Sequence, residues 1–311
     1  MAMNDDLEQQ LAPLLGSLGA QPPPPPALRS QVLEAALRRR APGSSPDPDP
    51  SIPIDPVDVF GLGVAASVAE VERLAGSMWS APLLRREWNV QEMVGHLLGA
   101  ARYMAGALGL DDPIEGVPLA EHVPFTQEWI DRHRGASPGD TAAAFIASFT
   151  SLADAASRLR NADLATATEY YGFEIARGTA LVAASFELWA HVDDIRRAVG
   201  HEPHPLSPEE LSIMCRLAAG VLPFTLGYVG TPHLDRTARL VLTGPGGGTF
   251  VVTTGDESRS PGDEDALIVT DALDFCRIAG RHLDVDEVAH EVEGDQAFAR
   301  DLLASARVLA A

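Results

Sequence analysis

Three ionisable side chains recur at helical spacing in the segment 186–194, FELWAHVDD. On an α-helix Glu187, His191 and Asp194 occupy positions i, i+4 and i+7, so they fall on one line along its surface. A mainly apolar stripe with similar spacing runs beside that line: Leu181, Ser185, Leu188, Val192, Ile195 and Val199. A carboxylate and an imidazole one turn apart can chelate a divalent metal, but such a pair needs at least one more protein ligand.

His96 is the best candidate for the further ligand. Asn89 can cap a helix and Glu92, three residues later, can complete a capping box, so a helix is predicted to begin at Val90. His96 lies on the flank of the buried stripe of that helix, which comprises Val90, Met93, Val94, Leu97, Leu98, Ala101 and Met104. The residues alone leave a second interpretation open, in which His96 and His191 are ordinary half-buried histidines hydrogen-bonded to their neighbours.

Four long helices must position these side chains. Apolar spacing places them near residues 57–78, 90–108, 141–160 and 179–199, with Asp55 capping the first and Gly200 ending the last. The connection 110–138, which contains His122 and His133, crosses between the second and third helices and can cover the site. After residue 200 the pattern predicts a small α+β domain, with a helix at 209–224, a hairpin of strands 237–242 and 249–253, a strand at 266–269, a helix at 272–279, a strand at 289–292 and a helix at 296–309.

Two short segments carry a resemblance to a known family: Trp88-Asn89-Val90 with His96-Leu97, and Glu187-Leu188-Trp189-Ala190-His191 with Asp194-Ile195. They resemble the mycothiol-dependent maleylpyruvate isomerase family of the DinB-like superfamily, over residues 55 to 200. A second resemblance follows along the chain. Asp265–Val269, Ala279-Gly280-Arg281 and Val292–Asp295 are similar to the small sterol-carrier-like domain that often follows the bundle in that family.

The resemblance implies a metal site in a four-helix bundle. In the family the aligned His, Glu and His bind a divalent metal, usually zinc, which implies His96, Glu187 and His191 as ligands. It also implies mycothiol as the thiol cosubstrate of a metal-dependent isomerase or S-transferase that acts on a small electrophile. Two imidazoles and one carboxylate leave zinc an open position, where an entering thiol is deprotonated and becomes a nucleophile at neutral pH.

Asp194 and Arg281 are candidates for catalytic roles. Asp194, one turn beyond His191, can orient a ligand or accept a proton, and the alternative is a structural ion pair with Arg197. Arg281, which follows Gly280, can anchor a substrate carboxylate, and again the alternative is a structural ion pair.

The composition excludes several classes of protein. The 311 residues carry a formal net charge of -21, whereas nucleic acid and anionic membranes both demand a cationic face, so we expect neither as a partner. The first residues contain no basic leader before an apolar run, which predicts a cytoplasmic protein. Lysine is absent, which removes Schiff-base and P-loop chemistry, and Cys215 and Cys276 fall in apolar helical patterns typical of buried thiols.

The predicted fold is mainly α and has three parts. Residues 1–54 form a helical arm and Pro-rich linker, 55–202 a DinB-like metal-binding four-helix bundle, and 203–311 a sterol-carrier-like α+β domain. The arm packs on its own bundle or on a dimer mate, which leaves a homodimer open, or it binds another protein. The alternative to an enzyme is a non-catalytic, metal-stabilised binding or regulatory protein that uses the arm, and a fourth ligand from His122 or His133 would favour it.

Overall fold

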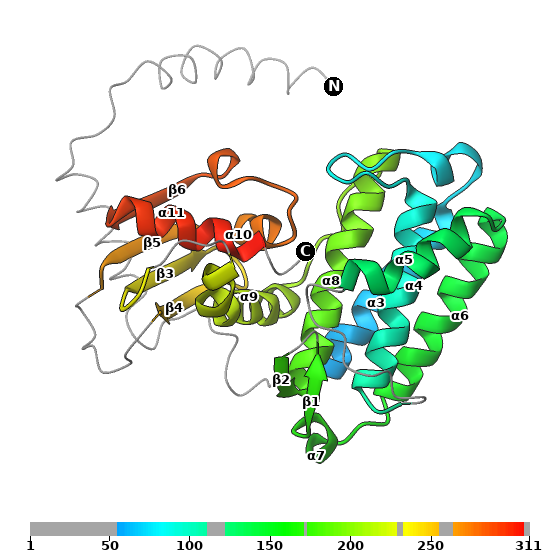
Figure 1. Ribbon diagram of the computed structural model, residues 1–311, viewed down its shortest axis with the longest axis horizontal. Coiled ribbons are helices and arrows are strands. Elements are labelled where there is room, and N and C mark those ends of the chain that lie inside the picture. The colour runs from blue at the N-terminus through cyan, green and yellow to red at the C-terminus, as the bar shows by residue number, and fades with distance from the viewer. Residues whose placement is uncertain (1–54, 111–121, 171–172, 229–232, 255–263, 308–311) are drawn as a thin grey trace, which may run out of the picture. The chain divides into compact units, whose positions relative to one another are not determined.

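The computed structural model of the chain describes residues 55–110, 122–170, 173–228, 233–254 and 264–307 (Figure 1). The predicted arm, residues 1–54, lies outside the described residues, and so does Tyr171. Residues Pro46–Ala311 form one compact unit, which contains every described element. The predicted boundary between bundle and α+β domain near residue 202 stays a prediction.

The four predicted long helices are present: α3 (Pro56–Arg73), α4 (Val90–Ala107), α6 (Pro138–Ala156) and α8 (Arg177–Val199). Their ends follow the capping residues, because Asp55 accepts a hydrogen bond from the Val57 amide and the Asn89–Glu92 capping box is complete. Gly200 ends α8 in the left-handed conformation, at φ 73°. The mainly α fold is therefore confirmed, although the first helix is shorter than predicted and is followed by a separate 3-10 turn, η1 (Gly76–Ser80).

The connections contain elements that the sequence analysis missed. A helix, α5 (His122–Arg134), lies in the segment between α4 and α6 and packs on α4. Gly95 and Gly99 permit this close contact, because a Cβ at Gly95 would lie 3.1 Å from the Ile130 Cα and one at Gly99 would lie 3.0 Å from the Thr126 Cγ2. A short helix, α7 (Asn161–Leu164), and an antiparallel pair, β1 (Ala167–Tyr170) and β2 (Phe173–Ala176), precede α8.

The C-terminal part is the predicted α+β arrangement. Its elements are α9 (Pro208–Tyr228), β3 (Thr237–Thr243), β4 (Gly248–Thr253), β5 (Ala266–Asp271), α10 (Ala272–Ala279), η3 (Val285–Glu287), β6 (His290–Gly294) and α11 (Gln296–Ser305). The sheet order is β4-β3-β5-β6, in which β3 and β5 run parallel and the outer pairs run antiparallel. Cys215 and Cys276 are buried free thiols in its core, as predicted, with their Sγ atoms 3.6 Å apart.

Helix α8 belongs to two hydrophobic cores at once. Leu181, Ala184 and Leu188 pack with α3, α4 and α6 in the bundle core. Phe186, Trp189 and Ala190, on another side of the helix, pack with α9, α10 and α11 in the C-terminal core. The segment that carries Glu187 and His191 is therefore held from both sides, which suits a site that needs fixed geometry.

Helix α9 is long and apolar enough to cross a membrane by length and composition alone. Its residues Leu211, Cys215, Ala218 and Leu222 are buried in the C-terminal core. Such burial is typical of the core helix of a soluble protein, so the length and composition of α9 carry little weight.

Candidate metal centre

Two helices bring together the three side chains that were predicted as ligands. His96 comes from α4, and Glu187 and His191 come from α8, one turn apart. One potential ligand atom from each residue lies within 4.8 Å of the others. The two histidines are 1% and 2% exposed and the glutamate is half-buried, so the group is largely removed from solvent.

The polar atoms face one another across the gap between α4 and α8. His96 Nε2 lies 3.6 Å from Glu187 Oε1. The His96 and His191 rings meet edge to face, with centroids 4.9 Å apart and planes at 85°. These distances suit ligands arranged around a common centre, because zinc–ligand bonds of about 2 Å separate neighbouring ligands by more than 3 Å.

Thr126 of α5 orients the His96 ring. His96 Nδ1 lies 2.9 Å from Thr126 Oγ1, and the threonine is completely buried. A protonated Nδ1 donates to that hydroxyl oxygen and leaves the lone pair on Nε2, the nitrogen on the side of Glu187. A hydrogen bond to the second ring nitrogen is the usual way in which proteins fix the orientation of a histidine ligand.

His191 is held in its neutral form. Burial, reinforced by the positive charge of Arg86, lowers the pKa of His191 from 6.5 to about 3. A neutral imidazole is the form that binds metals, and it avoids a charge in a desolvated site.

Asp194 has partners on three sides. Its Oδ2 accepts a hydrogen bond from Arg86 Nε at 3.0 Å and lies 3.9 Å from His191 Nδ1, while its Oδ1 lies 3.4 Å from His282 Nε2. Burial opposes ionisation of Asp194, but the interactions with His191, His282 and Arg86 outweigh it and hold the pKa of Asp194 below its usual range. The predicted alternative, an ion pair with Arg197, is wrong, because Arg197 Nε donates to Asp193 Oδ2 at 2.8 Å instead.

Arg281 lies near the same carboxylate. It follows α10 with a left-handed φ of 63° and its side chain is exposed. Partial burial, followed by the charges of Arg86 and Arg307, lowers the pKa of Arg281, while Asp194 opposes this change. The structure records no ion pair of Arg281 within the described residues, so the alternative of a structural ion pair has no support there.

Of the other two predicted histidines, His133 has a described side chain and does not join the cluster. His133 Nδ1 lies 3.2 Å from Thr141 Oγ1, against α6. The side chain of His122 lies outside the described residues. Within the described parts of the chain, the group of His96, Glu187 and His191 has no fourth member.

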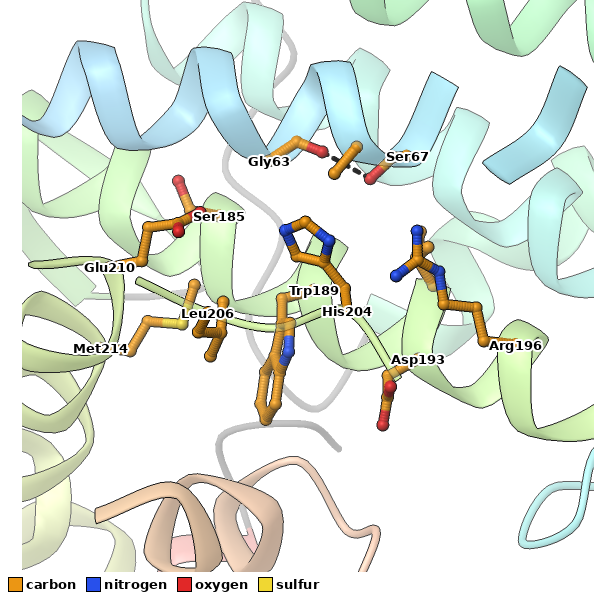
Figure 2. A pocket seen from close by; sticks show the side chains of 12 residues that line it. Gly63, Ser67, Ser185, Trp189, Asp193, Arg196, His204, Leu206, Glu210 and Met214 are labelled. Carbon is orange, nitrogen blue, oxygen red and sulfur yellow. Dashed lines mark hydrogen bonds between the residues drawn. The ribbon is translucent and has the colours of Figure 1, made fainter. Parts of the chain in front are cut away.

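A small cavity lies on the far side of α8 (Figure 2). Because an α-helix turns about 100° per residue, its lining residues Ser185, Trp189 and Arg196 point away from Glu187. Figure 2 shows the His204 ring turned toward Ser67 of α3. The volume of about 20 Å³ leaves room for about one water molecule, so this cavity is too small for a substrate.

Three polar residues at the centre were missed by the sequence analysis: Arg86, Thr126 and His282. Each lies far along the chain from the residue that it contacts, so no helical or strand spacing in the sequence indicates the contact. Arg86 adjoins the segment that carries the resemblance, whereas the other two become visible only once α5 and the turn after α10 are placed.

Comparison with known proteins identifies the bundle. Residues 60–196 match the family model described as the mycothiol maleylpyruvate isomerase N-terminal domain. Two solved structures share the fold: the mycothiol-dependent maleylpyruvate isomerase and a histidine-to-alanine mutant of it. Each is 14% identical, with a TM-score of 0.54, over 78% of this chain and 94% of that chain.

The fold similarity therefore extends beyond the matched bundle into the C-terminal part. The search of curated proteins found no match. The part of the chain that resembles a known family is therefore residues 60–196, a little under half of its length, and the family is that of the mycothiol maleylpyruvate isomerase N-terminal domain.

Proposed function

We propose that the protein is a metal-dependent, mycothiol-using isomerase or S-transferase that acts on a small electrophilic substrate. The observation that carries the proposal is the buried group of His96, Glu187 and His191 in a bundle of this family. The proposal rests on side-chain geometry as well as on the family match. The solved structures support the fold alone, because they are only 14% identical to this chain.

The three residues fit a divalent metal. Two imidazoles and one carboxylate are a common donor set for catalytic zinc, and His191 is already neutral. When bound there, zinc would supply a Lewis acid with an open position that promotes loss of the proton from an entering thiol. Three protein ligands would leave a zinc ion one open position for the thiol, which is the arrangement of catalytic rather than structural zinc sites.

The surrounding residues have roles that follow from their contacts. Thr126 holds the His96 ring, and Asp194 lies beside His191 Nδ1, where a carboxylate orients a histidine ligand. Asp194 is buried and ionised, so it can also accept a proton from an incoming group on the side of His191. Arg86 balances the charge of that carboxylate.

Arg281 is the proposed anchor for an anionic substrate. Its guanidinium lies in the field of Arg86 and Arg307 and has no ion pair with another described residue, so a carboxylate arriving there would gain charge-assisted hydrogen bonds. The substitution Arg281→Met should raise the KM for an anionic electrophile about tenfold and leave the KM for a neutral one unchanged. Arg277→Met is the matched control, because Arg277 pairs with Asp274 on α10. An equal KM change for both substrates would contradict the assignment.

Mycothiol and a cytoplasmic location belong to the same proposal. The matched family is named for mycothiol, and both similar structures are of a mycothiol-dependent enzyme. A lysine-free, alanine-rich sequence suggests a high-GC genome, which agrees with an organism that makes this thiol.

The test is a titration of the cobalt-substituted protein with mycothiol. Sulfur-to-metal charge-transfer bands should appear as the thiol binds, glutathione should produce them weakly, and a panel of small electrophiles should contain at least one that is conjugated or isomerised. Absence of these bands at saturating mycothiol, together with no turnover across the panel, would overturn the proposal.

A further inference from the structure

The turn after α10 brings a second histidine against the metal-bearing helix. The His282 side chain is completely buried, and its Nε2 lies 2.9 Å from the carbonyl oxygen of Ala190, next to His191 in sequence. A carbonyl oxygen only accepts, so Nε2 carries the proton and donates. The same nitrogen lies 3.4 Å from Asp194 Oδ1.

The backbone of this turn is adapted to the contact. Arg281 adopts a left-handed φ of 63°, which costs a non-glycine residue about 1 kcal/mol or more. At Gly280 a Cβ would lie 3.3 Å from the Ala190 Cβ, which leaves little space for a larger residue. The turn therefore approaches α8 closely. The exposed Arg281 and the buried His282, which are consecutive in sequence, both lie near Asp194.

The contacts of the Asp194 carboxylate indicate what the His282 imidazole does. Arg86 and His191 contact Oδ2 of that carboxylate, and His282 contacts Oδ1. Arg86 hydrogen-bonds Oδ2, and the 3.4 Å between Oδ1 and the protonated His282 Nε2 is an electrostatic contact that favours this orientation of the carboxylate about its χ2 bond. His282 also lies 3.4 Å from Asp193 Oδ2, so it spans two consecutive acidic residues of α8.

We infer that His282 is a positioning residue, which holds Asp194 in register with His191 and so couples the C-terminal part of the chain to the metal centre. The inference rests on the proposed function for its catalytic consequence, but not for the contact itself. Loss of a residue that hydrogen-bonds a metal ligand typically costs about 10–100-fold in metal affinity or activity, and we expect an effect of this order when Asp194 loses its orientation.

Two variants separate positioning from packing. His282→Leu fills the space with an apolar side chain and removes the donor. His282→Gln retains an N–H donor near the position of Nε2. His233→Leu is the matched control, because His233 belongs to the same part of the chain and pairs with Asp301 instead. For each protein, cobalt dissociation constants, thermal unfolding, kcat and KM are measured.

His282→Leu should unfold cooperatively and bind cobalt at least tenfold more weakly than the wild type, with kcat reduced about 10–100-fold and KM changed less. His282→Gln should recover most of both losses, and His233→Leu should match the wild type. Equal cobalt affinity and kcat in His282→Leu and His233→Leu would overturn the inference. If His282→Leu binds cobalt weakly but the wild type shows no turnover, the positioning role of His282 is supported and the proposed function is contradicted.

The histidine tautomer gives a test that needs no variant. Long-range ¹H–¹⁵N correlation of the wild-type protein should show the His282 proton on Nε2, because that nitrogen donates to Ala190. A proton on Nδ1 alone would overturn the inference even if both substitutions prevented folding.

Discussion

Arg86 Nε donates a hydrogen bond to Asp194 Oδ2 over 3.0 Å, and this ion pair joins the segment before α4 to the polar row of α8. Both side chains are largely buried, at 14% and 11% exposure. The pair ties α8, which supplies His191, to the segment that leads into α4, which supplies His96. Its geometry therefore bears on the stability of the bundle and on the arrangement of the candidate ligands.

Replacing Arg86 with Met should destabilise the protein by about 3 kcal/mol, because it leaves the Asp194 carboxylate buried without the guanidinium that hydrogen-bonds it. Urea unfolding measures the change. Arg300→Met, which removes an exposed pair with Asp286, is the control and should cost much less. Equal losses in the two variants would show that burial adds nothing to the Arg86 pair.

Replacing Thr126 with Val should weaken metal binding about 10–100-fold, because it preserves the shape but removes the hydroxyl that contacts His96 Nδ1. Competition titration with a chromophoric chelator measures the affinity. Thr126→Ser keeps the hydroxyl and should bind nearly as well as the wild type. If the Val and Ser variants bind alike, the hydroxyl does not orient His96.

The contribution of His133 to stability should depend on pH. Burial, reinforced by Arg132, lowers the pKa of His133 below its ordinary value of 6.5, so the unfolded chain binds a proton more readily than the folded one. Its stabilising contribution is complete above pH 6.5 and falls as the pH drops toward the folded-state pKa. The variant His133→Asn, whose amide can still reach Thr141, should not show this pH-dependent loss of stability.

Urea unfolding of the wild type and His133→Asn at pH 8 and pH 5 checks this expectation. The wild type should lose more of its free energy of unfolding between the two conditions than the variant does, since the other titrating groups are common to both. A pH-independent difference would mean that His133 titrates alike in the folded and unfolded chains.

Local signals predicted the helices but not the contacts between distant segments. The Asn89–Glu92 capping box and the apolar stripes were sufficient to locate α4 and α8, and the one-turn spacing of Glu187 and His191 was sufficient to pair them. The alternative of an Asp194–Arg197 ion pair failed because Arg197 pairs with Asp193, four residues away, and helical spacing cannot detect the actual partner of Asp194, Arg86, which is 108 residues away in sequence.

The missed residues share a physical cause. Thr126 contacts His96 only because Gly95 and Gly99 let α5 approach α4, and His282 contacts Ala190 only because of the left-handed turn at Arg281. Such approaches are set by tertiary packing, which a periodic sequence pattern does not encode. Short strands such as β1 and β2 also leave too few residues for a period to be recognised.

Deleting residues 1–54 should leave a folded protein that retains its metal, because the Pro-rich linker separates this segment from the bundle that begins at α3. Calorimetry of residues 55–311 should show a cooperative unfolding transition, with partial destabilisation allowed. Loss of that transition would place the arm within the core and make the predicted boundary at residue 54 wrong.

The most direct test is the metal content of the purified protein and of three single variants. The wild type should carry about one equivalent of divalent metal, and His96→Ala, Glu187→Ala and His191→Ala should each lose it, because two remaining ligands hold zinc poorly. His133→Asn should retain the metal, and circular dichroism should show that each variant keeps its helices. Unchanged metal content in all three alanine variants would contradict the assignment of the centre.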